Sequence, residues 1–227
     1  MAFTNLRYIA QSIADNLGKP IDVPLLRRLE RDVVAKRATL IRNDFTKNKT
    51  TYSQLVQDIG CIKLDKVDIK ECCDAEIENC KVTKTTQQVP VPIRFKESVS
   101  PFAYVGGTNK STPYTWTTPE QMPYLIAGRR YKAKELLYYT YLNGHIYVFS
   151  PFGQEAVKNI NVRAVFEDPV ALQKLKNCAG EQCVEPGDFP IPMDMEDNIK
   201  KLMYAELSAM QPKVPQEVTQ DDSQVQS

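Results

Sequence analysis

The sequence predicts an α+β fold, with helices near both ends of the chain and a β-rich middle that contains a hairpin. Three observations indicate this class. Apolar residues recur at helical spacing over the first 50 residues and again after residue 194. Between these segments lie short runs rich in Val, Ile, Tyr and Thr, interrupted by Pro and Gly. The end of the chain is polar and acidic, which is typical of a disordered tail.

Two helices are expected in the first 50 residues. The first carries a short apolar stripe at helical spacing, with Thr4 as its expected N-cap and Gly18 as its stop. The second begins at Asp22, which can cap it, and Pro24 fits its first turn because the missing N–H costs nothing there.

The middle of the chain carries the clearest local signal, in the stretch KELLYYTYLNGHIYVFS. Asn143-Gly144 between two runs of β-formers is the residue pair preferred in a type I′ hairpin. The stretch NINVRAVF alternates as a strand does, and the EDP that follows it opens a short helix through Leu175. VPVPIRF is expected to form an edge strand, since its prolines cannot donate ladder hydrogen bonds.

The stretch DFPIPMDMEDNIKKLMYAELSAMQP predicts a C-terminal helix with Asp194 as its N-cap. Its apolar stripe comprises Ile199, Leu202, Met203, Leu207 and Met210. This stripe either docks on another chain, as an assembly helix, or closes the core of its own subunit. We therefore divide the chain into a helical segment 1–50, a β-rich domain 51–188, a docking helix 189–212 and a flexible tail 213–227.

The charge of the chain is balanced overall but divided along its length. The 227 residues carry a net charge of +1, yet residues 22–49 hold eight Lys or Arg against four Asp or Glu. Residues 185–227 hold three against nine. Such opposed ends can attract each other within one fold or between copies, or form two solvated faces. We expect a protein without membrane contact that stays in the cytosol or leaves the cell by a route other than secretion, such as lysis, because no signal-peptide pattern and no apolar run of ~18 residues occurs.

Two basic clusters are candidates for contact with DNA phosphates or with an acidic partner. Arg28, Arg31 and Arg42 share one face of the second helix, although a solvated face would show the same pattern. The second cluster, in GRRYKAKE, comprises Arg129, Arg130, Lys132 and Lys134. Basic residues on a sheet edge also serve to discourage unwanted pairing, which is the alternative for this cluster.

No residues in the sequence form a recognisable catalytic set. His145 is the single histidine, and neither a G-x-S-x-G elbow nor a phosphate-binding loop is present. We therefore expect no catalytic residue, no cofactor and no enzymatic activity. The six cysteines match no common zinc spacing, so we expect no metal site, and a cytosolic location disfavours disulfides. We interpret most of them as small buried hydrophobes.

The order of these parts resembles a family of phage proteins. The basic helical head, the stretch RYKAKELLYYTYLNGHIYVF, the strand ending in FEDP and the C-terminal DFPIPMDMEDNIKKLMYAELSAM are similar to head-to-tail connector, or tail adaptor, ring proteins of short-tailed crAss-like phages. The resemblance implies a virion structural protein, assembled in the bacterial cytoplasm as a homo-oligomeric ring with twelvefold symmetry. It also implies contact with the portal and other tail or ring proteins, and a role in lining or sealing the DNA exit channel during genome ejection.

A second function class is open at this point. A nucleic-acid-binding regulator would use the basic helix 22–49 and the GRRYKAK run, and its binding would weaken steeply with salt. An electrophoretic shift assay separates the two hypotheses, since a regulator must bind nucleic acid at low salt.

Overall fold

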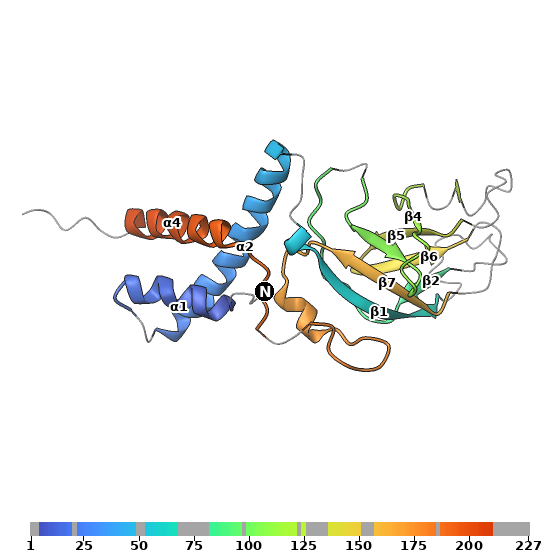
Figure 1. Cartoon of the computed structure of the whole chain (residues 1–227), viewed down its shortest axis with the longest axis horizontal. Helices are drawn as coiled ribbons and strands as arrows, with labels where there is room; N and C mark the ends of the chain where they lie inside the picture. Colours follow the sequence, from blue (N-terminus) through green and yellow to red (C-terminus); the bar gives the residue numbers. More distant parts are fainter. Residues whose placement is uncertain are drawn as a thin grey trace, which may run out of the picture.

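The computed structural model describes residues 5–19, 22–48, 53–67, 82–96, 99–121, 124–125, 136–150, 157–184 and 187–210. The chain forms a helical lobe and a β lobe side by side along the long axis of the molecule (Figure 1). Helices near both ends of the chain make the helical lobe, and the strands of the middle make the β lobe. The predicted α+β class, with helices flanking a β-rich middle, is confirmed.

The helical lobe consists of α1 (Leu6–Asn16), α2 (Val23–Asn48) and α4 (Met193–Met210). Asp22 caps α2 as expected, because its Oδ1 accepts a hydrogen bond from the backbone N–H of Leu25 at 3.0 Å. Asn5 caps α1, with Oδ1 accepting from the N–H of Arg7 at 2.9 Å. Thr4, the expected cap, lies outside the described residues, and the cap stands one position later in the chain.

Helix α4 begins two residues earlier than its sequence indicates. The carbonyl of Pro192 accepts the N–H groups of Met195 and Glu196 at 3.1 and 3.0 Å, and Met193 is the first helical residue. Asp194 therefore lies inside the first turn, and the prediction that it caps the helix is wrong. Its negative charge still favours the helix, because the N-terminal end of the helix dipole is positive.

The three helices share one apolar core, to which the β lobe adds a few residues. Its buried members are Ile9, Ala10, Ile13, Ala14, Leu29, Val33, Ala38, Ile41, Leu55, Ile93, Val165, Phe189, Met195, Ile199 and Met203. Residues from the two ends of the chain thus bury one another, and neither end can complete this core alone.

The β lobe is a seven-stranded sheet that curls until its edges meet. Its strands are β1 (Gln57–Lys66), β2 (Thr83–Thr85), β3 (Tyr104–Gly106), β4 (Thr115–Trp116), β5 (Tyr138–Leu142), β6 (His145–Phe149) and β7 (Asn159–Ala164). Their spatial order is β3-β7-β1-β2-β6-β5-β4, and only the β4–β5 pair is parallel. A bridge between Gly106 of β3 and Pro113, two residues before β4, brings the two ends of this order together.

The hairpin predicted at Asn143-Gly144 joins β5 and β6. Both turn residues have positive φ, 51° and 79°, as a type I′ turn requires. The five residue pairs of this hairpin run from Tyr138–Phe149 to Leu142–His145. Inward side chains of the hairpin join those of β1, β3 and β7 in a second apolar core that fills the β lobe.

Two 3₁₀ helices flank the sheet, η1 (Ser53–Leu55) and η3 (Val170–Lys174). Asp168 Oδ1 accepts the N–H of Val170 at 2.9 Å, so the EDP sequence opens η3 as expected. The VPVPIRF stretch forms no regular strand; it makes a bridge between Pro92 and Phe166 and single hydrogen bonds on either side. The prolines explain this, because two of its residues lack an N–H for the ladder.

Candidate functional site

The apolar stripe of α4 is covered largely by its own subunit. Ile199 and Met203 are fully buried in the core that α4 shares with α1 and α2. Leu207 is half-buried at the edge of the same core, whereas the side chain of Leu202 is 41% exposed. Met210 is the last helical residue, and its side chain lies outside the described part. Ile199 and Met203 therefore close the core of their own subunit, which is one of the two roles considered for the stripe. Leu202 faces outward.

Polar contacts also fix α4 within the subunit. The hydroxyl of Tyr204 accepts from Asn16 Nδ2 and donates to the carbonyl of Ser12 at 3.3 Å. Lys36 of α2 forms an ion pair with Glu206. Contacts on two sides hold the helix in place before any neighbour binds.

The predicted basic face of α2 is exposed, and its arginines have partners within the chain. Arg28 Nε lies 3.7 Å from Asp32 Oδ2, one turn along the helix. Arg31 Nε donates to the carbonyl of Arg27 at 3.3 Å. Arg42 pairs with Glu167, which follows β7, and so ties α2 to the β lobe.

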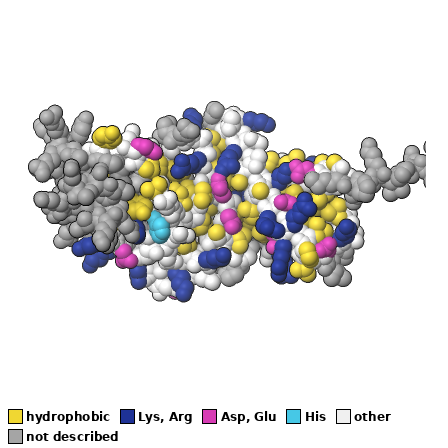
Figure 2. Space-filling view, turned by 180° about the vertical axis from the view of Figure 1, so that it is seen from behind, with side chains coloured by type: hydrophobic (Ala, Val, Ile, Leu, Met, Phe, Trp, Pro, Cys, Tyr) yellow, Lys and Arg dark blue, Asp and Glu magenta, His cyan; other side chains and the backbone are white. Residues whose placement is uncertain are grey.

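The surface of the helical lobe mixes charges of both signs. Figure 2 shows Lys and Arg side chains interspersed with Asp and Glu side chains on the face of this lobe seen from behind. An interspersed surface of this kind binds a phosphate backbone less strongly than a continuous basic surface does. The arrangement disfavours the regulator hypothesis. The second cluster, Arg129, Arg130, Lys132 and Lys134, lies outside the described residues.

Sequence reasoning missed the central residue of the junction between the lobes, Arg37. Its side chain is fully buried, with Nε donating to the carbonyl of Pro190 and Nη1 to the carbonyl of Phe166, both at 2.9 Å. Its guanidinium lies over the ring of Phe189, 5.5 Å from the ring centroid. One arginine thus connects α2, the chain after β7 and the chain leading into α4.

The electrostatics of Arg37 reflect this position. Burial lowers the pKa of Arg37 to about 10, and the nearby Asp168 partly offsets the effect by raising it. The side chain therefore stays charged at neutral pH. Helical spacing was the sequence signal for the burial of Arg37. Arg37 lies four residues after the buried Val33 and four before the buried Ile41, so all three share one face of α2.

Asp58 is the centre of a second polar cluster, at a bulge in β1. It accepts Lys110 Nζ at 2.7 Å, Arg163 Nε at 2.9 Å and Asn161 Nδ2 at 3.2 Å. It also accepts the N–H of Gly60, whose φ of +73° makes the bulge. Partial burial alone would raise the pKa of Asp58, but the four hydrogen bonds together lower it below its ordinary value. The cluster pins the turn after β3 to β1.

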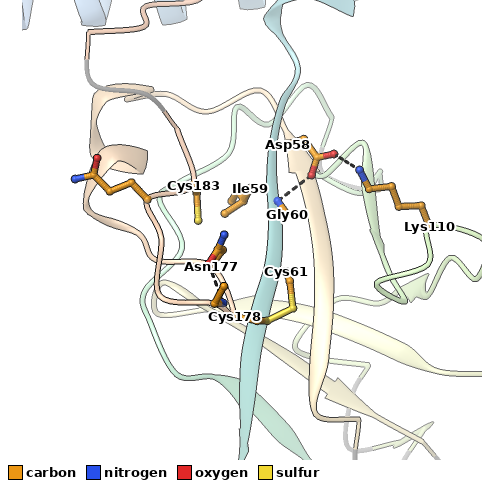
Figure 3. Close-up of a pocket in the computed structure, with 10 residues that line it drawn as sticks. Asp58, Ile59, Gly60, Cys61, Lys110, Asn177, Cys178 and Cys183 are labelled. Carbon is orange, nitrogen blue, oxygen red and sulfur yellow. Dashed lines mark hydrogen bonds and ion pairs between the residues drawn. A yellow bond between two sulfur atoms is a disulfide. The ribbon is translucent and has the colours of Figure 1, made fainter.

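A groove lies beside this cluster, with a volume of about 370 Å³, and Figure 3 shows Asp58, Cys61, Cys178 and Cys183 along it. Cys61 and Cys178 form a disulfide, although the expected cytosolic location disfavours one. The fold brings together two residues that are 117 positions apart, which spacing rules for short motifs do not address. Cys183 is a free thiol, and Cys72, Cys73 and Cys80 lie outside the described residues.

The structure assigns His145 a local hydrogen-bonding role. Its Nδ1 lies 2.8 Å from the carbonyl oxygen of Thr85 and 3.3 Å from the hydroxyl of the same residue. Within the described ranges, no group of three or more His, Cys, Asp or Glu side chains could hold a metal ion. In the same ranges, no helix combines the length and the apolar character needed to cross a lipid bilayer.

Comparison with known protein families places the chain. A family model for crAss-like phages, described as phage tail ring protein 2, matches residues 25–225. No curated protein matches the chain. The matched range includes α2 from Leu25 onward, the seven strands of the sheet and α4, and with them the Arg37 junction, whereas α1 lies before it. The chain therefore belongs to the phage tail ring protein 2 family and is a structural ring protein of the virion.

Proposed function

We propose that this protein forms a homo-oligomeric ring that connects the portal to the tail and lines or seals the DNA exit channel. The family match over residues 25–225 is the observation that carries the proposal. The ring follows the twelvefold symmetry of the portal, is assembled in the bacterial cytoplasm, and acts through contacts rather than catalysis. A ring of this kind closes through two different surfaces of each subunit, one on each side.

The outward side of α4 is the proposed docking surface, within the segment 189–212. Leu202 is its apolar centre, and Lys201 and Ala205 are exposed beside it. Because Ile199 and Met203 hold the helix against α1 and α2, this surface is ordered before it binds, which lowers the entropy lost on docking. The segment 213–227 serves in this proposal as a flexible extension.

The exposed end of α2 is the proposed site for DNA or an acidic partner. Arg28 and Arg31 supply it, since their partners are a neighbouring turn and a backbone carbonyl of the same helix. Arg42 contributes less, because its guanidinium is engaged by Glu167. Exposed ion pairs of this kind contribute little to stability and can be exchanged for a stronger anionic partner.

Size-exclusion chromatography with light scattering tests the proposal, on full-length protein alone and mixed with the portal. The expected result is a ring, either alone or bound to the portal, which electron microscopy of the same sample resolves. A protein that stays monomeric in both samples and does not bind the portal would rule the proposal out.

A pair of variants tests the docking surface. Leu202→Asp places a charge on the exposed face and should leave the subunit folded while it prevents ring formation. Lys66→Asp, which places the same charge on an exposed residue of β1 away from α4, is the matched control and should assemble normally. Deletion of the residues after Gln211 should have a smaller effect than Leu202→Asp; the reverse order would show that the tail, and not the helix, carries the contact.

A further inference from the structure

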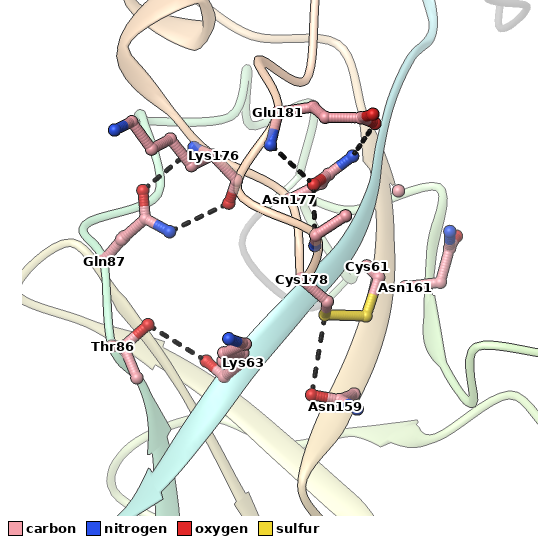
Figure 4. The surroundings of a disulfide bond; sticks show 12 residues. Cys61, Lys63, Thr86, Gln87, Asn159, Asn161, Lys176, Asn177, Cys178 and Glu181 are labelled. Atoms are coloured by element: carbon pink, nitrogen blue, oxygen red, sulfur yellow. Dashed lines mark hydrogen bonds between the residues drawn. A yellow bond between two sulfur atoms is a disulfide. The ribbon is translucent and has the colours of Figure 1, made fainter.

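Two cysteines from distant parts of the sequence meet at the surface of the β lobe. Cys61 lies on β1, Cys178 lies on the loop after η3, and their Cα atoms are 5.3 Å apart (Figure 4). Both residues are half-buried, and they line an open groove. A small thiol or disulfide compound can therefore reach them.

Hydrogen bonds hold the loop against β1 independently of the sulfur–sulfur bond. The N–H of Cys178 donates to the carbonyl of Cys61 at 3.0 Å. Asn177 Oδ1 accepts the N–H groups of Ala179 and Glu181 at 2.8 and 3.0 Å, which shapes the turn. Further along, Gln87 bonds both the N–H and the carbonyl of Lys176, at 3.0 and 2.9 Å. The two sulfur atoms thus stay adjacent whether or not they are bonded.

The free thiol of Cys183 lines the same groove, so it is the obvious competitor for the pair. Burial raises the pKa of Cys183 to about 11. Roughly one part in ten thousand of this thiol is then ionised at pH 7, and only the ionised form attacks a disulfide. Cys183 is a poor exchange partner, which leaves Cys61 and Cys178 as a defined pair.

We infer that Cys61 and Cys178 form a redox-dependent disulfide. The two residues are free thiols under reducing conditions and are bonded under oxidising conditions, and the loop keeps the same conformation in both states. Closure consumes one molecule of a small disulfide such as oxidised glutathione. One cysteine thiolate attacks it and releases one thiol, and the second cysteine then displaces the other thiol. Two protein thiols are oxidised, and one disulfide is reduced to two thiols.

The inference stands apart from the ring proposal, since it concerns a single subunit. Bacterial cytosol keeps thiols reduced, whereas a released particle has no such protection. The disulfide would be absent while the chain folds and formed in the finished particle. Closing a loop of more than a hundred residues restricts the unfolded chain strongly, so the closed form is the more heat-resistant one.

Peptide mapping tests the pairing. Full-length protein is made in a bacterial cytosol. In the first sample, the cells are lysed directly into an alkylating agent. In the second sample, the protein is incubated with oxidised glutathione before alkylation. Digestion with trypsin and a glutamate-specific protease separates Cys178 from Cys183, because Glu181 lies between them. We expect both cysteines to be alkylated in the first sample and Cys61 to be linked to Cys178 in the second. A link already present in the first sample, no link in the second, or a link to Cys183 would each overturn the inference.

Thermal unfolding tests the effect. Oxidised wild type should melt about 10 °C above the reduced protein. Cys178→Ser should have the melting temperature of the reduced wild type, and reductant should not change it. A transition at that temperature also shows that the variant folds. Cys183→Ser is the matched control and should keep the full response. A reductant response that persists in Cys178→Ser would contradict the assignment and point to other cysteines.

Discussion

The two lobes of this protein are stabilised in different ways. The β lobe closes on itself: its edges are bridged, its core is filled by its own strands, and a disulfide ties a loop to β1. The helical lobe is assembled from the two ends of the chain, and it leaves helix faces outward with Leu202, Arg28 and Arg31 on them. The difference is that the β lobe buries its own apolar side chains, whereas the helical lobe carries the faces that we propose as surfaces for other molecules.

Arg37 connects the two lobes, and its replacement should have the largest effect. Arg37→Ala leaves the buried carbonyls of Phe166 and Pro190 without donors and opens a cavity over Phe189. We expect the free energy of unfolding to fall by about 3–5 kcal/mol, as measured by denaturant unfolding. Arg31→Ala, on the exposed face of the same helix, should cost less than about 0.5 kcal/mol. Equal effects would mean that Arg37 does not bridge the lobes.

The second-largest effect on stability is expected on the buried side of α4, compared with its exposed side. Met203→Ala removes a buried side chain from the helical core and should destabilise the subunit by about 2–4 kcal/mol. Leu202→Ala removes an exposed one and should cost less than about 1 kcal/mol. Thermal unfolding of the two variants under identical conditions measures the difference. A larger loss for Leu202→Ala would show that α4 is rotated relative to this description.

Replacement of Asp58 in the β lobe should have a smaller effect than replacement of Arg37 or Met203. Its lowered pKa means that its contribution to stability is fully present above the ordinary pKa of 3.8 and is lost as the pH falls through the lower folded value. Because the carboxylate is 34% exposed and its ion pairs are screened by solvent, we expect less than about 1 kcal/mol between wild type and Asp58→Asn at pH 7.

Urea unfolding from pH 7 to pH 3 checks this prediction. The difference between wild type and Asp58→Asn should shrink as the pH falls below 4, since the wild-type carboxylate then takes up a proton. A difference that grows under acid would contradict the assigned direction of the pKa shift.

Local signals in the sequence account for much of the fold. Asn143-Gly144 predicts the hairpin and Asp22 predicts the start of α2, because in both cases the physical cause lies within a few residues. Asp194 fails as a cap because the Pro192 carbonyl accepts the first hydrogen bonds of the helix, which therefore begins two residues earlier. Such errors are small, since each concerns the exact end of a correctly predicted element.

Long-range contacts were beyond the reach of the same reasoning. In the sequence, Arg37 looks like the other arginines of a basic helix. Its hydrogen-bond acceptors, the carbonyls of Phe166 and Pro190, lie more than a hundred residues away and reach it only in the folded chain. The pairing of Cys61 with Cys178 has the same origin. The burial of Ile199 and Met203 depended on whether α1 and α2 or another chain would cover them, and helical spacing is the same in both cases.

The most direct test of the whole account is a cryo-EM map of the assembled ring at side-chain resolution. The account predicts that Ile199 and Met203 are covered by α1 and α2 of their own subunit while Leu202 is covered by a neighbouring chain. A ring in which Leu202 faces solvent, with the contacts between subunits made entirely by the β lobe, would contradict it.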